Sequence, residues 1–305
     1  MNDSNRKPAS NRRFSQKPNF DKPNPNKRFS QKPNFSKSTP NRHFSPKPDF
    51  EKKYSPGIKQ AFALRHEKNR RKNEKFLVEG VKIIKEIISI SPDIFKEVFI
   101  SKSVNHNDLI SLIKNKRVCY SLVTDEDIAH LSDTESHQGV IAVARFSNLK
   151  PNWSTCRYVT ILDAVQDPGN VGAVIRTSFA FGVDAVILGK GCCDIYNPKV
   201  VRASAGQFLR MPFEAGVDII TKLNYLRQKG FTILATSSKA SYTIDQVKKR
   251  KKVALIVSNE GSGINLQLNT MADEIVKIPM KNKVESLNVA VAHGILINAL
   301  VSDRQ

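Results

Sequence analysis

The chain has 305 residues and a formal net charge of +21 at pH 7, with 49 Lys and Arg against 28 Asp and Glu. A charge of this size and sign favours a polyanionic partner such as a nucleic acid. The four cysteines show no CxxC spacing, and no apolar run is long enough for a membrane span or a signal peptide. These features predict a cytoplasmic protein with free thiols and exclude membrane-spanning and disulfide-stapled classes.

Residues 1–57 differ in composition from the rest and are predicted to be a disordered basic tail. The string RFSQKPNF starts at 13 and again, 15 residues later, at 28, and the variant HFSPKPDF starts at 43. Units this short cannot form a solenoid, and Pro, Asn, Ser and Lys dominate. The segment holds 14 Lys and Arg against 4 Asp and Glu, interleaved with six phenylalanines. This composition suits stacking on unpaired bases and contact with phosphates; a spacer tail is the alternative.

Residues 58–150 are predicted to form a small α/β domain. Strand-like runs occur at 76–80, 97–100, 118–122 and 140–144, with a periodic helix over 81–90. His137 has no partner at metal-ligand spacing, so we interpret it as structural and predict no metal site. Residues 152–156 are predicted to be a linker to the C-terminal half of the chain.

Two basic stretches continue the positive charge beyond the tail. Five cations crowd residues 65–72, and 248–252 is an unbroken basic run. Each is either a solvated face or a surface for a polyanionic partner, and the overall charge favours the partner.

The C-terminal half contains three apolar runs that each end in a loop rich in Gly, Asn, Pro or Ser. The first, 158–162, is typical of a buried parallel strand; residues 167–170 break it, and 171–181 has helical spacing. Gly172 lies near the start of that helix, where a missing side chain admits another backbone or a ligand. Arg176 follows one turn later on the same face. Alone, this segment is an ordinary strand–turn–helix unit.

The second run, 253–257, leads into Asn259-Glu260-Gly261-Ser262-Gly263, which puts a carboxylate between flexible residues. The two glycines can expose backbone N–H groups to a ligand. The spacing is not that of a P-loop or of a dinucleotide-binding turn, so neither of those sites is supported.

The third run is a short strand, 275–278, followed by Pro279 and a polar loop. Ser286-Leu287-Asn288 then opens an apolar helix that extends to about residue 301, and either Ser286 or Asn288 can cap it. In an open α/β sheet, ligands bind at the carboxyl ends of the strands, so one pocket can use all three loops.

Taken together, the three loops resemble the three motifs of the SpoU (TrmH-like) family of RNA ribose 2'-O-methyltransferases, which use S-adenosylmethionine. The resemblance covers about half of the chain. It implies a SPOUT-type methyltransferase domain over 155–305, with a parallel α/β sheet and a C-terminal trefoil knot. It also implies that 58–150 is an RNA-binding substrate domain and that the protein forms a homodimer through its C-terminal domain. The knot follows from the family, because general rules of topology disfavour knots.

The resemblance also assigns site residues. The catalytic group that it implies is Asn170, Arg176, Glu260, Ser286 and Asn288. Contacts to the cofactor are expected from Thr236, Ser258, Asn259, Gly261, Ile278, Met280 and Leu287. The chain departs from the family at Ser258, where the second motif usually has Gly, and the added side chain can narrow the adenosine pocket.

The implied reaction is an in-line displacement of the sulfonium methyl group by a ribose 2'-hydroxyl. Since the methyl donor is already activated, the protein must mainly align the reactants and help the hydroxyl lose its proton. The family commonly assigns the base to the first-motif arginine, here Arg176, although a guanidinium stays protonated at neutral pH. Holding an RNA phosphate and stabilising developing negative charge suits Arg176 better, and its role stays open.

The separate substrate domain and the string His137-Gln138-Gly139 resemble the ribosomal RNA branch of the family, with a guanosine of large-subunit RNA as the expected target. Methylation of transfer RNA is the first alternative. The second is a non-catalytic RNA-binding ribosome-assembly factor of the same fold. Such a factor is expected to have lost Asn170, Arg176, Glu260 or Asn288, and all four are present.

Overall fold

The structure is a computed structural model, and it describes residues 54–147, 149–248, 250–259, 266–282 and 284–302. Nearly all of the predicted tail lies outside the described residues. So do Glu260 and Gly261 of the predicted site.

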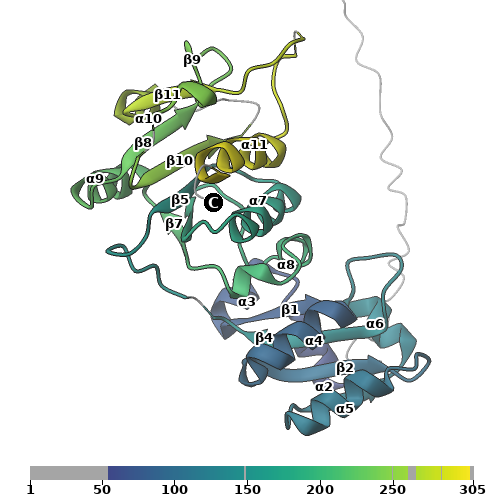
Figure 1. Ribbon diagram of the computed structural model, residues 1–305. Helices are drawn as coiled ribbons and strands as arrows, with labels where there is room; N and C mark the ends of the chain where they lie inside the picture. The colour runs from purple at the N-terminus through teal and green to yellow at the C-terminus, as the bar shows by residue number, and fades with distance from the viewer. Residues whose placement is uncertain (1–53, 148, 249, 260–265, 283, 303–305) are drawn as a thin grey trace, which may run out of the picture. The chain divides into compact units, whose positions relative to one another are not determined.

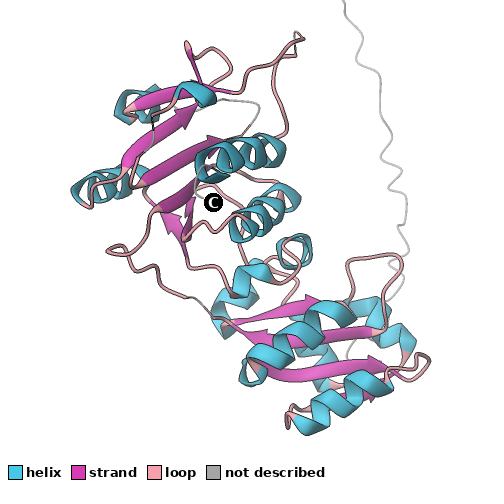
Figure 2. Ribbon diagram, in the orientation of Figure 1, coloured by secondary structure: helices cyan, strands magenta, loops and turns pink. Residues whose placement is uncertain are grey.

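The N-terminal described part is a four-stranded sheet with helices packed around it (Figures 1 and 2). Its strand order is β1-β4-β2-β3, in which β4 is antiparallel to β1 and β2, and β2 is parallel to β3. The four predicted strands are confirmed, and helix α4 has the predicted bounds. In chain order the elements are α2 (Pro56–Ala63), α3 (Glu67–Asn73), β1 (Lys75–Glu79), α4 (Val81–Ile90), η1 (Pro92–Ile94), β2 (Phe95–Ser101), α5 (Asn107–Asn115), β3 (Tyr120–Val123), α6 (Asp125–Leu131) and β4 (Val140–Arg145).

Helix α2 begins at Pro56, two residues before the boundary expected between tail and domain. The hydroxyl of Ser55 caps the helix by accepting the backbone N–H of Ile58 at 3.4 Å, and Pro56 occupies the first helical position. Tyr54 stacks on His130 with 4.3 Å between ring centroids. The folded part therefore includes the residues just before 58.

The C-terminal described part is a seven-stranded sheet in the order β7-β6-β5-β10-β8-β11-β9, and every pair is parallel (Figure 1). The strands predicted at 158–162, 253–257 and 275–278 are confirmed as β5, β10 and β11. No helix in the described part of the chain combines the length and apolarity that a membrane span requires. In chain order the elements are β5 (Tyr158–Asp163), α7 (Pro168–Ala180), β6 (Ala185–Gly189), α8 (Pro198–Ala203), η2 (Gln207–Leu209), β7 (Phe213–Val217), α9 (Ile219–Gln228), β8 (Thr232–Thr236), β9 (Tyr242–Thr243), η3 (Ile244–Gln246), β10 (Val253–Ser258), α10 (Leu266–Met271), β11 (Glu274–Lys277) and α11 (Val289–Val301).

Helices cover both faces of this sheet. One apolar cluster packs α7, α8 and α11 against one face, and a second packs α9 and α10 against the other. Neighbouring strand residues alternate between the clusters, as Ile161 and Leu162 do in β5. Two covered faces explain why the strands read as continuous apolar runs. The predicted parallel α/β sheet is thus confirmed. The knot depends on chain threading, which the strand order does not test, and it stays a prediction.

A buried ion pair joins helix α3 of the N-terminal part to Asp194, in the loop between β6 and α8 of the C-terminal part. The side chains of Arg70 and Asp194 are 2% and 8% exposed. Nε and Nη2 of Arg70 donate to Oδ2 of Asp194 at 2.8 and 2.6 Å. Nη1 donates to the backbone oxygens of Leu64 and Arg65 at 3.0 and 2.7 Å. Arg70 is therefore a structural residue.

This arrangement removes Arg70 from the basic stretch 65–72 as a contact for a polyanion, while Lys68, Arg71 and Lys72 stay exposed. Arg70 faces the interior, Arg65 pairs with Asp133, and Arg71 pairs with Glu67 one helical turn earlier. A run of cations in the sequence looks the same whether its partners are solvent, phosphate or distant carboxylates. Here much of the charge is matched within the protein.

Candidate functional site

The predicted cofactor residues meet at one cavity of about 440 Å³ at the carboxyl ends of β8, β10 and β11. These three strands are neighbours in the sheet, so the loops that follow them lie side by side. Ser286 of the predicted catalytic group also lines the cavity. The predicted cofactor residues that line it are Thr236, Ser258, Asn259, Ile278, Met280 and Leu287.

The chemistry of this cavity suits a nucleoside with a charged tail. Val257, Val276 and Leu296 supply apolar wall, while Ser237 and Lys239 supply polar groups. A cavity of this volume with a few convergent polar groups is typical of cofactor sites. The residues present therefore fit S-adenosylmethionine, whose adenine needs apolar contact and whose ribose and amino acid end need hydrogen bonds.

Helix α7 begins where the sequence breaks the first apolar run. Pro168 takes the first helical position, and the carboxylate of Asp167 accepts the backbone N–H of Asn170 at 2.8 Å. That hydrogen bond is the largest cause that holds the pKa of Asp167 below its usual value, and Lys199 at 3.4 Å acts in the same direction. The cap fixes Asn170 in the first turn.

Asn288 connects the first motif with the third. Its side-chain amide donates to Oδ1 of Asn170 at 2.9 Å. Its Oδ1 accepts the backbone N–H groups of Ala290 and Val291 at 3.0 and 3.3 Å, and so caps α11. Of the two residues proposed as caps, Asn288 is the one that caps, and Ser286 faces the cavity instead.

Gly172 admits a neighbouring backbone and not a ligand. A Cβ at this position would lie 2.5 Å from Cβ of Ala203 and 2.8 Å from the backbone oxygen of Val200, both on α8. Any larger residue would push α8 away from α7. Arg176 follows one turn later on α7. Gly172 is buried against α8, whereas the side chain of Arg176 is exposed.

Arg176 makes no hydrogen bond or ion pair with any residue that the structure describes. It does not line the cofactor cavity, and neither do Asn170 and its partner Asn288, although Leu287 and Val289, the neighbours of Asn288 in the chain, do. Glu260 and Gly261 lie outside the described residues.

His293 contributes to this site although the sequence did not mark it. It is fully buried on α11, and its Nε2 lies 3.0 Å from Oγ1 of Thr160 on β5 and 3.3 Å from Oγ of Ser178 on α7. Burial lowers its pKa to about 4, so the imidazole is neutral near pH 7. The cluster holds the helix that carries Asn288 against the helix that carries Asn170 and Arg176. The sequence signal that could have revealed His293 is a single histidine within an otherwise apolar helix.

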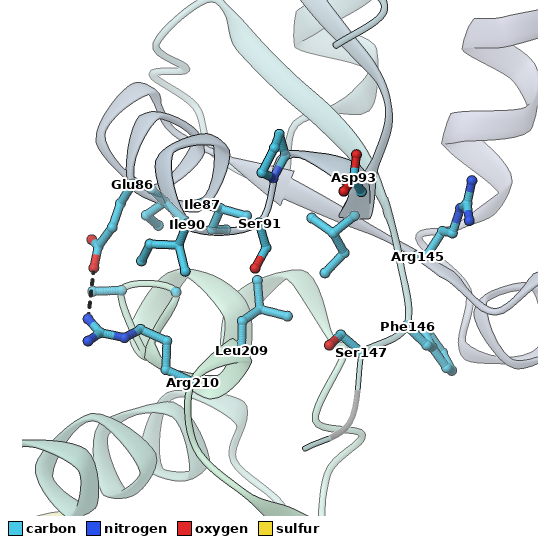
Figure 3. A pocket seen from close by; sticks show the side chains of 15 residues that line it. Glu86, Ile87, Ile90, Ser91, Asp93, Arg145, Phe146, Ser147, Leu209 and Arg210 are labelled. Carbon is cyan, nitrogen blue, oxygen red and sulfur yellow. Dashed lines mark ion pairs between the residues drawn. The ribbon is translucent and has the colours of Figure 1, made fainter. Parts of the chain in front are cut away.

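A second hollow of about 440 Å³ lies away from the motif loops (Figure 3). Figure 3 shows Ile87 and Ile90 on one side and Leu209 on the other, with Arg210 paired to Glu86 across the opening; their charged groups are 3.6 Å apart. None of the predicted site residues lines it. Volume alone therefore does not identify the cofactor site, whereas the convergence of the second and third motif loops does. Within the described residues, no group of His, Cys, Asp and Glu could hold a metal ion.

Comparison with known proteins identifies two family models in this chain. The SpoU rRNA methylase family matches residues 157–298, and the MRM3-like substrate binding domain matches residues 55–142. Together they cover most of the part that the structure describes.

Curated relatives match along nearly their whole length. The 23S rRNA (guanosine(2553)-2'-O)-methyltransferase RlmP of Bacillus subtilis is 33% identical over 79% of this chain and 94% of its own. The 23S rRNA (guanosine-2'-O-)-methyltransferase RlmB of Escherichia coli is 29% identical over 75% of this chain and 98% of its own.

Solved structures show the same fold. A TrmH-family RNA methyltransferase from Porphyromonas gingivalis superposes with a TM-score of 0.68 at 26% identity, over 82% of this chain and 99% of its own. The SpoU methyltransferase AviRb from Streptomyces viridochromogenes, solved with AdoMet, gives a TM-score of 0.73 at 21% identity, over 82% and 98%. At that identity the second match speaks for the SPOUT fold alone.

Proposed function

Because the chain belongs to the SpoU rRNA methylase family, we propose that it transfers the methyl group of S-adenosylmethionine to the ribose 2'-hydroxyl of a guanosine in 23S ribosomal RNA. The named relatives RlmP and RlmB both act on guanosine of 23S rRNA, and they match the substrate domain as well as the catalytic one. The chain is thus an enzyme that uses S-adenosylmethionine, and the identity of its target nucleotide is the proposed part.

The observation that carries the proposal is the hydrogen bond between Asn170 and Asn288 beside the cofactor cavity. It holds together the first motif, which carries Arg176, and the third motif, which supplies Ser286 and Leu287 to the cavity wall. A methyl donor in the cavity and a guanidinium that holds the RNA would together align the reactants for in-line transfer to an RNA hydroxyl.

We assign Thr236, Ser258, Asn259, Ile278, Met280 and Leu287, with Gly261, to the binding of the cofactor. When bound, S-adenosylmethionine supplies a methyl group already activated by its sulfonium. Leu287 and the apolar wall would contact the apolar parts of the cofactor, and the polar loops after β8 and β10 would form hydrogen bonds with its polar groups. Ser258 lines the cavity at the position where the family usually has Gly, so its side chain limits the room beside the adenosine.

Arg176 binds an RNA phosphate and stabilises negative charge as the 2'-hydroxyl loses its proton. Asn288 caps α11 and binds Asn170 in the first turn of α7, while Glu260 and Ser286 orient the ribose and Arg176. Arg176 thus acts at the reacting centre, and the two asparagines hold the helix that carries it in position. The general base is then water or a phosphate of the RNA itself.

We further propose a homodimer formed through α11. Val291 and Ile295, one helical turn apart on α11, are 53% and 41% exposed, although the opposite side of that helix is buried. Two adjacent aliphatic side chains that are exposed in a single copy are better explained if a second copy of the protein covers them than if they face water. A cytoplasmic location follows from the proposed ribosomal RNA substrate.

The direct test is methyl transfer from labelled S-adenosylmethionine to unmodified 23S rRNA, with transfer RNA as the comparison, followed by digestion to nucleosides. We expect label in 2'-O-methylguanosine from 23S rRNA alone. Arg176→Ala should lower kcat/KM by at least about a hundredfold while the Kd of the cofactor stays within about twofold. Lys229→Ala removes an equally solvent-facing cation from the end of α9 and should change neither. Label in transfer RNA only would replace the proposed substrate.

A further inference from the structure

Another hollow, of about 710 Å³, follows the edge of the large sheet next to the cofactor cavity. The outermost strand there is β9, which pairs with β11 alone among the described strands (Figure 1). Ser237, Lys239 and Asn269 line both this edge hollow and the cofactor cavity, so the two share a wall. The enclosed side-chain oxygen of Asn269 has no hydrogen-bond donor among the described residues. Methyl transfer as derived above uses none of the residues that line the edge hollow alone, Tyr242 and Lys248 among them.

Tyr242 on β9 lines the edge hollow with its ring open to solvent. Its side chain is 63% exposed, the largest fraction among the exposed large apolar side chains of the described residues. Phenol rings are costly to leave in water and are enriched where a partner covers one face. The position is also an edge strand, which lacks a neighbour on its outer side.

The charge of the edge hollow is positive once its ion pairs are taken into account. The two carboxylates on its wall are matched: Glu274 pairs with Arg250 at 2.8 Å and Asp273 with Arg227 at 2.9 Å. Lys239 and Lys248 also line it, are exposed, and make no ion pair with any residue that the structure describes. An open aromatic ring and two ammonium groups on the wall of one hollow are complementary to a nucleotide.

We propose that Tyr242, Lys239 and Lys248 form a subsite for an unpaired nucleotide of the RNA substrate, whose base stacks on the Tyr242 ring while the two lysines contact the adjoining phosphates. Aromatic side chains with nearby cations bind single-stranded RNA in this way, because every base has a stacking face. Since the edge hollow shares a wall with the cofactor cavity, the stacked base belongs to a nucleotide near the target ribose. The identity of the RNA rests on the proposed function, whereas the stacking does not.

The subsite makes the enzyme prefer RNA that is single-stranded beside its target. Tyr242→Ala should weaken RNA binding by about tenfold or more, in the range measured for loss of a stacked base. KM for RNA should rise by a similar factor, while kcat at saturating RNA and the cofactor Kd stay unchanged. Tyr242→Phe is the matched control, since it keeps the ring and should bind RNA normally. Lys239→Ala and Lys248→Ala should each flatten the salt dependence of RNA binding.

Fluorescence gives a direct readout of stacking. In Tyr242→Trp the new indole should be quenched by a short unpaired oligoribonucleotide but not by an abasic ribose-phosphate oligomer of equal length. The parent protein, with Trp153 as its one tryptophan, supplies the background. Equal quenching by the abasic oligomer, or unchanged RNA affinity of Tyr242→Ala, would overturn the proposal. Quenching that depends on protein concentration without RNA would also overturn it, because a second copy would then cover Tyr242.

The proposed function and the proposed nucleotide subsite can be refuted independently of each other. If the parent protein methylates no RNA but Tyr242→Trp is still quenched by bases, the proposed function is lost and the subsite stands. If methyl transfer is normal and Tyr242→Ala binds RNA like the parent, the subsite is lost and the function stands.

Discussion

Asn288 donates a hydrogen bond of 2.9 Å to Asn170, 118 residues earlier in the chain, with the same side chain that caps helix α11. The amide nitrogen holds the neighbouring motif, and the amide oxygen holds the start of the helix. One residue thus serves both stability and the alignment of the site, and two substitutions can separate these roles.

Asn288→Ser should retain the helix cap but lose the bond to Asn170, because a serine hydroxyl is too short to reach it. We expect its free energy of unfolding to stay within about 0.5 kcal/mol of the parent, and Asn288→Ala to lose about 1 kcal/mol. Both variants should lose methyl transfer to a similar extent. Urea unfolding and single-turnover methylation measure the two effects. Normal turnover in Asn288→Ser would show that the bond does not align the site.

Removing residues 1–53 should weaken RNA binding and flatten its salt dependence, because the segment carries 14 Lys and Arg against 4 Asp and Glu. The deletion stops there so that Tyr54 and the cap at Ser55 remain. Turnover at saturating RNA and the methylated nucleotide should not change. Binding titrations at several salt concentrations measure the slope. If the slope is unchanged, the tail is a spacer; if turnover at saturation is lost, the tail helps to build the active complex.

The buried pair of Arg70 and Asp194 should be costly to break from one side. Arg70→Met leaves a carboxylate that is 8% exposed without its partner, and we expect a loss of about 3–5 kcal/mol in the free energy of unfolding. Arg70→Met combined with Asp194→Leu should lose less than the two single variants together. Arg71→Met is the control: its pair with Glu67 is exposed, and its loss should cost at most about 0.5 kcal/mol. Additive losses in the double variant would mean that the pair is not coupled.

His293 should make the protein lose stability in acid. Its folded pKa is lowered to about 4 from 6.5, so below pH 6.5 the unfolded chain takes up a proton that the folded chain refuses. The free energy of unfolding should therefore fall as pH drops from 6.5 towards 4, by on the order of 3 kcal/mol, and be insensitive to this group above 6.5. His293→Met should reduce that slope, whereas His66→Asn, at an exposed position, should keep it. An unaltered slope in His293→Met would assign the acid sensitivity to other groups.

Local sequence signals predicted the strands well and the long-range partners poorly. The runs at 158–162 and 253–257 are apolar and flanked by breakers, and a buried parallel strand needs nothing more to be recognised. The same rule that puts ligands at strand ends predicted that Ser258 and Ile278 share a cavity, which they do. Arg70 reads as one cation in a basic cluster, because its partner Asp194 lies 124 residues away.

Two further features depended on packing that periodicity does not encode. Gly172 allowed either a ligand or a backbone as its neighbour, and only the position of α8 decides for the backbone. The roles of His293 and Asn288 arise where α11 meets α7, and neither helix alone carries that information. Tyr242 gave no signal either, since a short edge strand has too few residues to show a period.

Methylation of a 23S rRNA guanosine that depends on Arg176 is tested most directly by mapping 2'-O-methyl groups across total RNA. Three strains are compared, which carry the intact gene, a deletion, or Arg176→Ala. We expect one guanosine of the large-subunit RNA to be methylated in the first strain and unmethylated in both of the others. Identical maps in all three strains, or full methylation with Arg176→Ala, would contradict it.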